Sequence, residues 1–374
     1  MNQSDTIAAT SDDVRIRSTT ILPSPHEMKE MLPVMDTTQL RICEDRQHIR
    51  NIIRWDDSRL LVVVWPCSIH DERSAQEYAD KLVSVKDQYP HLKIVMRVYF
   101  EKPRTTVGWK WLINDPYLDE SCQMEEGLIL ARKILLDINN KRLPVAVEFL
   151  DPISPQYMGD LVAWGAVGAR TTESQTHREM ASGLSASIGF KNGTDGSIDV
   201  AINAMQSAQS PHNFLGIDQN GQIARIETSG NPDVHIVLRW GKNPNYDEMS
   251  VKTVAKQLEQ AWLAPRVMID ASHGNSNKDH RLQWLVVQNI ANQVREGSQN
   301  ILGVMIESHI HEGKQSHTPG KDDPKNLKHG VSITDGCIGW EETVTLLDDL
   351  NEAAESRLAF LRHITPVIQG EKIV

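Results

Sequence analysis

Hydrophobic positions recur along the chain in eight short apolar runs. Each run ends on a charged residue or on a residue that can ligate a metal, and stretches with helical spacing separate the runs. Strands that alternate with helices predict a parallel sheet, and eight of them predict an α/β fold, the closed (β/α)8 or TIM barrel. The runs begin at Leu60, Ile94, Val145, Ala166, Ala186, His235, Arg266 and Ile301.

The barrel is predicted over residues 59–365, with shorter segments on either side. Residues 1–58 are expected to form an N-terminal extension for packing, or for assembly and regulation, with a helix at Glu44 to Arg54. The last helix is predicted from about Glu341 to Leu361, and 366–374 is predicted to be a C-terminal tail.

A β-hairpin is predicted before the sixth strand, at about residues 212–229. Asn220 and Gly221 stand there between two alternating apolar runs. Asn-Gly favours the tight turn that joins antiparallel strands, because both residues tolerate positive φ. The hairpin is therefore expected as an insertion on the barrel.

Composition narrows the class of protein. The net charge of −11 over 374 residues argues against a nucleic-acid surface. We find no signal peptide and no apolar run long enough to cross a membrane. The four cysteines are widely spaced and indicate neither a disulfide framework nor a zinc motif, so a cytoplasmic protein is expected.

Positive charge is nevertheless concentrated at the strand ends, where the rim of the barrel is expected. Cations at the mouth of a barrel favour a small anionic ligand, most readily a phosphorylated one. The alternative is salt bridging to nearby acids, for which Glu148, Asp151, Glu173 and Asp195 are the candidates. The cations are Arg97, Lys102, Arg104, Arg170, Lys191 and Arg239.

Four potential metal ligands also fall at strand ends, namely Cys67, His273, Glu307 and Asp335. They follow the first, seventh and eighth runs, and in a closed barrel the first strand lies beside the eighth. Each residue alone is a weak signal, but their joint placement predicts one divalent ion. A thiolate, an imidazole and carboxylates together suit Mn, Fe, Co or Zn.

Long motifs spread over the whole barrel resemble one family. They are PCSIHD (66–71), MRVYFEKPRTTVGWK (96–110), EFLDPISPQY (148–157), GARTTESQTHREMASGLS (168–185), GFKNGTDGS (189–197), MIDASHGNSNK (268–278), IESHIHEG (306–313) and SITDGCIGW (332–340). From about Asp12 to Leu361 the chain resembles the type I 3-deoxy-D-arabino-heptulosonate 7-phosphate (DAHP) synthases. Among them it is most similar to the tyrosine-sensitive branch.

The resemblance implies a metal-dependent transferase that condenses phosphoenolpyruvate with D-erythrose 4-phosphate in the first step of the shikimate pathway. It implies the same four metal ligands. Lys102, Glu148, His273 and metal-bound water stay open as the proton donor or water activator. The implied phosphoenolpyruvate contacts are Arg97, the backbone of Ala169, Arg170, Lys191 and Arg239, with Glu148 nearby; those for the sugar phosphate are Lys102, Pro103, Arg104 and Thr105.

Feedback inhibition by an aromatic amino acid is also implied, in a homodimer or homotetramer. In the family the effector binds between barrel elements, the hairpin and a neighbour's N-terminal segment. Gly216 favours tyrosine over phenylalanine, because a small residue leaves room for a ring hydroxyl. The matching positions are Asp12, Asp13, Ile16, Asp151, Pro155, Gln156, Ser185, Phe214 and Gly216.

The chain departs from the family at five positions, where it has tryptophan and the family has glycine. These positions are Trp55, Trp65, Trp111, Trp240 and Trp262. An indole is expected to overcrowd a position that is built for close backbone approach. Three explanations remain open: accommodated tryptophans, a degenerate regulatory relative, or a codon UGA that means glycine in the source.

Two other functions compete with the synthase. A catalytically impaired regulatory relative is favoured by the tryptophans and disfavoured by the intact metal ligands. A related phosphoenolpyruvate-dependent sugar-acid synthase is disfavoured by the KPRTT loop at 102–106.

Overall fold

Eight parallel strands close into a barrel in the computed structural model, which describes residues 12–101 and 108–370, with side chains to residue 362. Their order around the barrel is β1-β10-β9-β8-β5-β4-β3-β2. This confirms the predicted fold, although the second and fourth strands each begin two residues before the predicted Ile94 and Ala166. The strands are β1 (Leu60–Trp65), β2 (Leu92–Arg97), β3 (Val145–Glu148), β4 (Trp164–Val167), β5 (Ser187–Lys191), β8 (Val234–Leu238), β9 (Val267–Asp270) and β10 (Ile301–Glu307).

The barrel closes between its first and last strands. β1 pairs with β10 in parallel, with Leu61 opposite Gly303 and Trp65 opposite Glu307. All six residues of β1 are buried, as expected for a strand with barrel interior on one side and helices on the other. The register places the C-terminal ends of β1 and β10 side by side.

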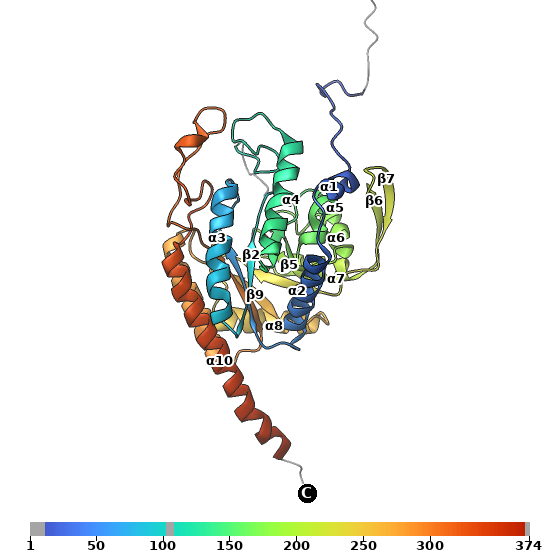
Figure 1. Ribbon diagram of the computed structural model, residues 1–374. Helices are drawn as coiled ribbons and strands as arrows, with labels where there is room; N and C mark the ends of the chain where they lie inside the picture. The colour runs from blue at the N-terminus through green and yellow to red at the C-terminus, as the bar shows by residue number, and fades with distance from the viewer. Residues whose placement is uncertain (1–11, 102–107, 371–374) are drawn as a thin grey trace, which may run out of the picture.

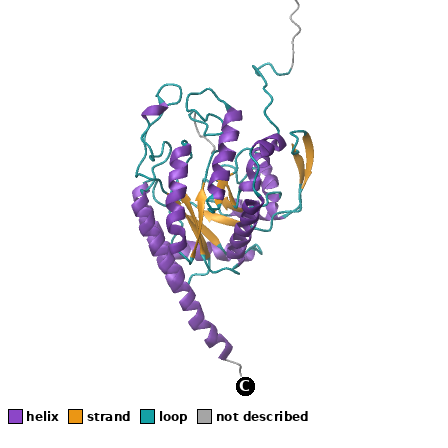
Figure 2. Cartoon of the chain, in the orientation of Figure 1, coloured by secondary structure: helices purple, strands orange, loops and turns teal. Residues whose placement is uncertain are grey.

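Helices form the outer layer of the barrel (Figure 2). In α3 the buried residues Ala75, Tyr78, Ala79 and Leu82 follow the i, i+3, i+4, i+7 spacing of a helix with one apolar face. The barrel helices are α3 (Glu72–Val85), α4 (Met124–Asn140), α5 (Ser154–Met158), α6 (Gln175–Ser182), α7 (Asp199–Gln209), α8 (Glu248–Gln260), α9 (Gln283–Arg295) and α10 (Trp340–Gly370).

The N-terminal extension contains α1 (Pro25–Met31) and α2 (Asp36–Arg54). The predicted helix at Glu44 to Arg54 is thus the second part of a longer helix. Ser24 and Glu27 cap the start of α1 reciprocally. From α2, the guanidinium groups of Arg50 and Arg54 donate to the Asp233 carboxylate at 2.6 and 2.9 Å. Asp233 directly precedes β8, so α2 is held at the N-terminal end of the barrel.

The predicted hairpin is confirmed as β6 (Asn213–Ile217) and β7 (Ile223–Glu227), which pair antiparallel. Gly221 in the turn has a φ of 75°, which glycine adopts without strain. The hairpin stands beside the barrel, next to α1 (Figure 1). The Gln219 carbonyl accepts from the His26 N–H at 2.7 Å, which ties the turn to α1.

The last helix is longer than predicted. α10 runs from Trp340 to Gly370 rather than ending at Leu361, so it takes up most of the predicted tail. Proline commonly ends a helix because it cannot donate to the preceding turn, yet Pro366 lies within α10. The helix extends beyond the barrel (Figure 1). Within the described part of the chain, no helix combines the length and the apolar character of a membrane span.

Candidate active site

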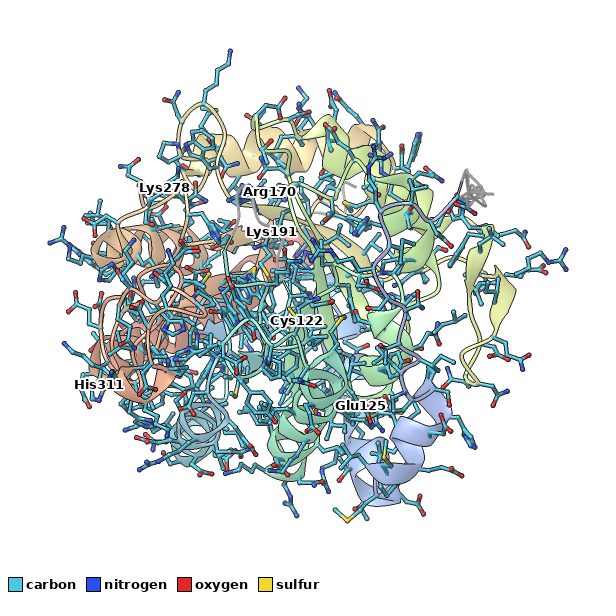
Figure 3. All side chains as sticks on the ribbon, turned by 90° about the horizontal axis from the view of Figure 1, so that it is seen from above. Cys122, Glu125, Arg170, Lys191, Lys278 and His311 are labelled. Carbon is cyan, nitrogen blue, oxygen red and sulfur yellow. The ribbon has the colours of Figure 1, made fainter. Side chains whose placement is uncertain are left out.

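The strands deliver their charged ends to one end of the barrel, where residues 108–123, before α4, and the loop after β10 rise above it (Figure 1). Seen from above, Arg170 and Lys191 lie close together, whereas His311 lies at the periphery (Figure 3). This end is the C-terminal face, where barrel enzymes place their active sites.

Three of the four predicted metal ligands converge here. The sulfur of Cys67 and carboxylate oxygens of Glu307 and Asp335 all lie within 4.8 Å of one another. The Cys67 thiol donates to the Asp335 Oδ2 at 3.1 Å. Cys67 lies two residues beyond β1, and Glu307 is the last residue of β10, so the pairing of these strands creates the cluster.

His273, the fourth predicted ligand, lies beside this cluster. Its Nε2 is 3.9 Å from the Glu307 Oε1, and its Nδ1 lies 3.1 Å from the Asp270 Oδ2 and 2.6 Å from the Ser272 hydroxyl. A carboxylate that accepts from one ring nitrogen orients the other towards a metal. Burial would raise the pKa of Asp270, but His273 and Lys191 outweigh it and hold that pKa well below its usual range.

Arg97 lies beneath the cluster and is almost completely buried. Its Nη1 donates to the Glu307 Oε1 at 2.8 Å, and its Nη2 donates to the Cys67 carbonyl at 3.3 Å. Burial alone would lower the pKa of Arg97, but Glu307 raises it well above its ordinary value. The guanidinium is therefore charged and fixes the carboxylate that faces the cluster.

A pocket opens directly beside the cluster, and charged residues dominate its wall. Lys191, which ends β5, is buried, with its Nζ 3.3 Å from the Asp270 Oδ2 and 3.8 Å from the Glu148 Oε2. The pocket thus collects four of the five residues predicted to contact phosphoenolpyruvate, while Arg97 lies against Glu307. Its lining residues are Glu148, Gly168, Ala169, Arg170, Lys191, Arg239 and His273.

The alternative, in which salt bridges to nearby acids neutralise the cations at the rim, holds for some of these cations. Lys191 pairs with Glu148 as anticipated, and Arg97 pairs with Glu307. The pairing of Lys191 with Asp270 was not anticipated. Asp270 ends a predicted strand and lies three residues before His273. This position in the sequence is the signal that could have identified it. Sequence reasoning singled out the histidine and missed the carboxylate that holds it.

The predicted sugar-phosphate contacts Lys102, Pro103, Arg104 and Thr105 lie outside the described residues. Glu101, just before them, is buried and accepts a hydrogen bond from the Ser154 hydroxyl at 2.8 Å. Burial raises the pKa of Glu101 from 4.5 to about 7.

The predicted effector residues are brought together only in part. Gln156 on α5 accepts a hydrogen bond from the Gln219 side chain at the hairpin turn, at 2.8 Å, which links α5 to the hairpin. Phe214 and Gly216 lie on β6, Pro155 lies on α5, Asp151 precedes α5, and Ser185 lies between α6 and β5. Asp12, Asp13 and Ile16 are exposed on a segment that runs away from the barrel (Figure 1).

Gly216 has a second reason to be small. A Cβ at this position would lie 2.8 Å from the Ile226 Cγ1 across the hairpin. Packing within the hairpin therefore requires glycine here, whatever binds beside it.

Known proteins match this chain along most of its length. The Tyr-sensitive phospho-2-dehydro-3-deoxyheptonate aldolase of Escherichia coli is 51% identical over 348 residues, which cover 93% of this chain and 97% of that protein. The tyrosine-inhibited enzyme of Schizosaccharomyces pombe is 49% identical over 350 residues, covering 92% and 94%. A solved phospho-2-dehydro-3-deoxyheptonate aldolase from Francisella tularensis superposes with a TM-score of 0.88 at 46% identity, covering 91% of this chain and 99% of that one.

The sequence model of the DAHP synthetase I family matches residues 33–348, which include all eight strands of the barrel. That span contains all four predicted metal ligands and every residue that lines the pocket. The fold, the geometry of the rim and these matches agree, and this chain belongs to the DAHP synthetase I family.

Proposed function

We propose that this chain condenses phosphoenolpyruvate with D-erythrose 4-phosphate and water to form DAHP and phosphate. The observation that carries the proposal is the cluster of Cys67, Glu307 and Asp335 directly beside the pocket that holds Lys191 and Arg239. The relatives named above carry the corresponding aldolase name, which supports it.

The pocket has the charges that phosphoenolpyruvate requires. Arg170, Lys191 and Arg239 are proposed to hold its phosphate and carboxylate, since guanidinium and ammonium groups form strong hydrogen bonds with such anions. Two phosphorylated substrates in one cavity repel each other, and the surrounding cations reduce that repulsion. Lys102, Pro103, Arg104 and Thr105 are proposed to hold the sugar phosphate.

One divalent metal ion is proposed as the cofactor, held by Cys67, His273, Glu307 and Asp335. The convergence of a thiol and two carboxylates beside an imidazole fits such an ion, and these ligand types suit Mn, Fe, Co or Zn. A bound ion would supply Lewis acidity towards the aldehyde of erythrose 4-phosphate.

Side chains of the protein are proposed to transfer the protons that the reaction requires. C3 of phosphoenolpyruvate attacks the aldehyde carbon, water adds at C2, and phosphate leaves by cleavage of its bond to C2. Lys102, Glu148 and His273 are the proposed proton donors and acceptors. Among them, Glu148 and His273 both line the pocket, with Glu148 beside the Lys191 ammonium.

An aromatic amino acid is proposed as a feedback inhibitor of this protein, with tyrosine favoured over phenylalanine. The proposed site is formed by α5, the hairpin and residues 12–16 of a second copy, within a cytoplasmic homodimer or homotetramer. The sensitivities in the names of relatives support an aromatic effector, and the bond between Gln156 and Gln219 joins two of these elements.

One assay tests the reaction and its alternatives. Phosphate release from phosphoenolpyruvate is measured with erythrose 4-phosphate or arabinose 5-phosphate, with and without a chelator. We expect release with erythrose 4-phosphate alone, and loss of it with the chelator. Release with arabinose 5-phosphate would instead identify a related sugar-acid synthase, and no release with either sugar would identify an impaired relative.

Cysteine variants test the metal site separately. We expect Cys67→Ser to lose bound metal and to lower the rate roughly 100-fold or more, because Lewis-acid stabilisation is worth several kcal/mol. Cys43→Ser and Cys122→Ser are matched controls, since both thiols are exposed. Equal metal content in all three variants would rule out Cys67 as a ligand.

A further inference from the structure

Four of the nine tryptophans have backbone conformations that suit glycine. Their φ angles are 70° at Trp55, 79° at Trp111, 145° at Trp240 and 59° at Trp262. Positive φ brings the Cβ of an L-residue close to its own backbone, so a bulky residue rarely adopts it. Four instances in one residue type therefore require a common explanation.

Trp55 ends α2 in the left-handed conformation, with its N–H donating to the carbonyls of Asn51 and Ile52. Glycine is the usual residue at such a helix exit. The indole packs against two buried guanidinium groups, with its ring centroid 4.1 Å from the Arg266 Cζ and 4.8 Å from the Arg357 Cζ. None of the three guanidinium nitrogens of Arg266 has a hydrogen-bond partner among the described residues. The indole ring thus occupies space in which water could otherwise hydrate the Arg266 guanidinium.

Trp262 shows the same backbone geometry without any packing to favour an indole. It follows α8, and its N–H donates to the Glu259 carbonyl at 3.0 Å. The residue is 95% exposed, which is unusual for the largest side chain. Only the helix exit constrains this position, and that exit favours glycine.

Trp240 lies at the rim of the candidate active site, directly after Arg239. Its carbonyl accepts from the Asn192 Nδ2 at 2.7 Å, which holds the backbone in place. The indole presses on the turn after His273, since a Cβ on Gly274 would lie 2.0 Å from the Trp240 Cγ. A glycine at position 240 would remove this contact beside a proposed metal ligand.

Trp111 is buried at positive φ and stacks on Trp109, with ring centroids 5.7 Å apart. Trp65 has ordinary backbone geometry, but its ring is crowded. Its centroid lies 4.1 Å from that of Tyr78, closer than the roughly 4.5–7 Å preferred by aromatic pairs. The Trp65 Nε1 has no hydrogen-bond partner in the described part of the chain, and Cys67 lies two residues further on.

The other four tryptophans differ in their backbone conformation. Trp109, Trp164, Trp284 and Trp340 have no positive φ. Trp109 donates to the Asp115 carbonyl at 2.8 Å, and Trp164 donates to the His235 Nε2 at 2.9 Å. These residues are suited to tryptophan and form an internal control.

We propose that positions 55, 65, 111, 240 and 262 are glycine in the protein as its source makes it. The shared cause is a UGA codon that the source translates as glycine and that the written sequence renders as tryptophan. The other four tryptophans are genuine. This inference rests on backbone geometry and packing, and it does not depend on the proposed reaction.

Peptide mass spectrometry of the protein from its native source tests the proposal. We expect glycine at all five positions and tryptophan at positions 109, 164, 284 and 340. The coding DNA is expected to show TGA (UGA in the messenger RNA) at the five positions and TGG (UGG) at the four. Tryptophan at the five positions in the native peptides, or UGG at all nine codons, would overturn the proposal.

Two recombinant variants test independently whether the backbone at position 262 favours glycine. Trp262→Gly is expected to raise the melting temperature by roughly 1–2 °C, because it relieves positive φ at an exposed site. Trp284→Gly is the matched control: this residue is 43% exposed within α9, and glycine there should lower the melting temperature. Equal lowering by both variants would contradict the assignment of position 262.

Discussion

At the scale of single residues, buried charges in the barrel mouth are held in pairs that also face the pocket. Asp270 contacts both Lys191 and His273, and Glu307 contacts Arg97. Removing one member of such a pair leaves an uncompensated buried charge, which is strongly destabilising. These side chains therefore serve the stability of the barrel as well as its chemistry.

His235 has a different role, because it is buried as the neutral imidazole inside the barrel wall. Its Nδ1 donates to the Ile236 carbonyl at 3.0 Å, and its Nε2 accepts from the Trp164 Nε1 at 2.9 Å. Burial lowers the pKa of His235 from 6.5 to about 4. The unfolded chain thus binds a proton more readily than the folded protein does.

The free energy of unfolding is therefore expected to fall as the pH drops from 6.5 to 4. The stability contributed by the depressed pKa is fully present above pH 6.5, and roughly 3 kcal/mol of it is lost by pH 4. We expect His235→Leu to remove this part of the pH dependence in urea unfolding measured across that range. His26→Leu, at an exposed position on α1, is the control, and equal slopes in both variants would contradict the prediction.

At the scale of elements, caps and turns determine where each helix begins beside the rim. Asp247 is the N-cap of α8, with its carboxylate accepting from the Ser250 N–H at 3.0 Å and from the Ser250 hydroxyl at 2.5 Å. The segment that carries Arg239 and Trp240 leads directly into this cap. The Asp247 cap thus fixes one end of the segment that carries Arg239, a residue of the pocket wall.

Removing this cap is expected to destabilise the protein by about 1 kcal/mol, because the Ser250 N–H loses its acceptor. Asp247→Ala should show this loss in urea unfolding at neutral pH. Asp247→Asn retains a side-chain acceptor and should lose much less. If the two substitutions have the same effect, the capping hydrogen bond does not contribute to stability.

At the scale of the whole molecule, the hairpin exposes apolar side chains away from the barrel. Leu215 is 84% exposed and Ile223 is 85% exposed, on the two strands of one small sheet. Exposed apolar residues that lie together on a projecting element favour contact with another chain. This surface supports the proposed homo-oligomer, in which the hairpin meets a second copy.

Polar substitutions on the hairpin are expected to weaken that assembly. Leu215→Ser combined with Ile223→Ser should shift the protein towards a smaller species in light scattering after gel filtration. The loss of buried apolar area at each interface is the physical reason. Met249→Ser, at a 73% exposed position on α8, is the control. An unchanged mass in the double variant would exclude the hairpin from the interface.

Much of the fold and part of the site were predictable from local patterns. Apolar runs with polar ends identify strands, and Asn220-Gly221 identifies a hairpin, because both signals lie within a few residues. The extent of α10 was not predictable, since Pro366 is a local signal for a helix end. The pairing of Asp270 with Lys191 was missed because Lys191 comes from β5, a separate strand of the closed barrel.

The sequence by itself determined the eight-stranded barrel, the hairpin and the chemical types at the rim, because periodicity and residue type act over short distances along the chain. Only the tertiary structure decided which ends meet. The pairing of β1 with β10 brings Cys67 to Glu307 and Asp335, and closure of the barrel places Lys191 beside Asp270. The positive φ at positions 55, 111, 240 and 262 is likewise seen only in the folded backbone, because residue type alone would favour negative φ for tryptophan.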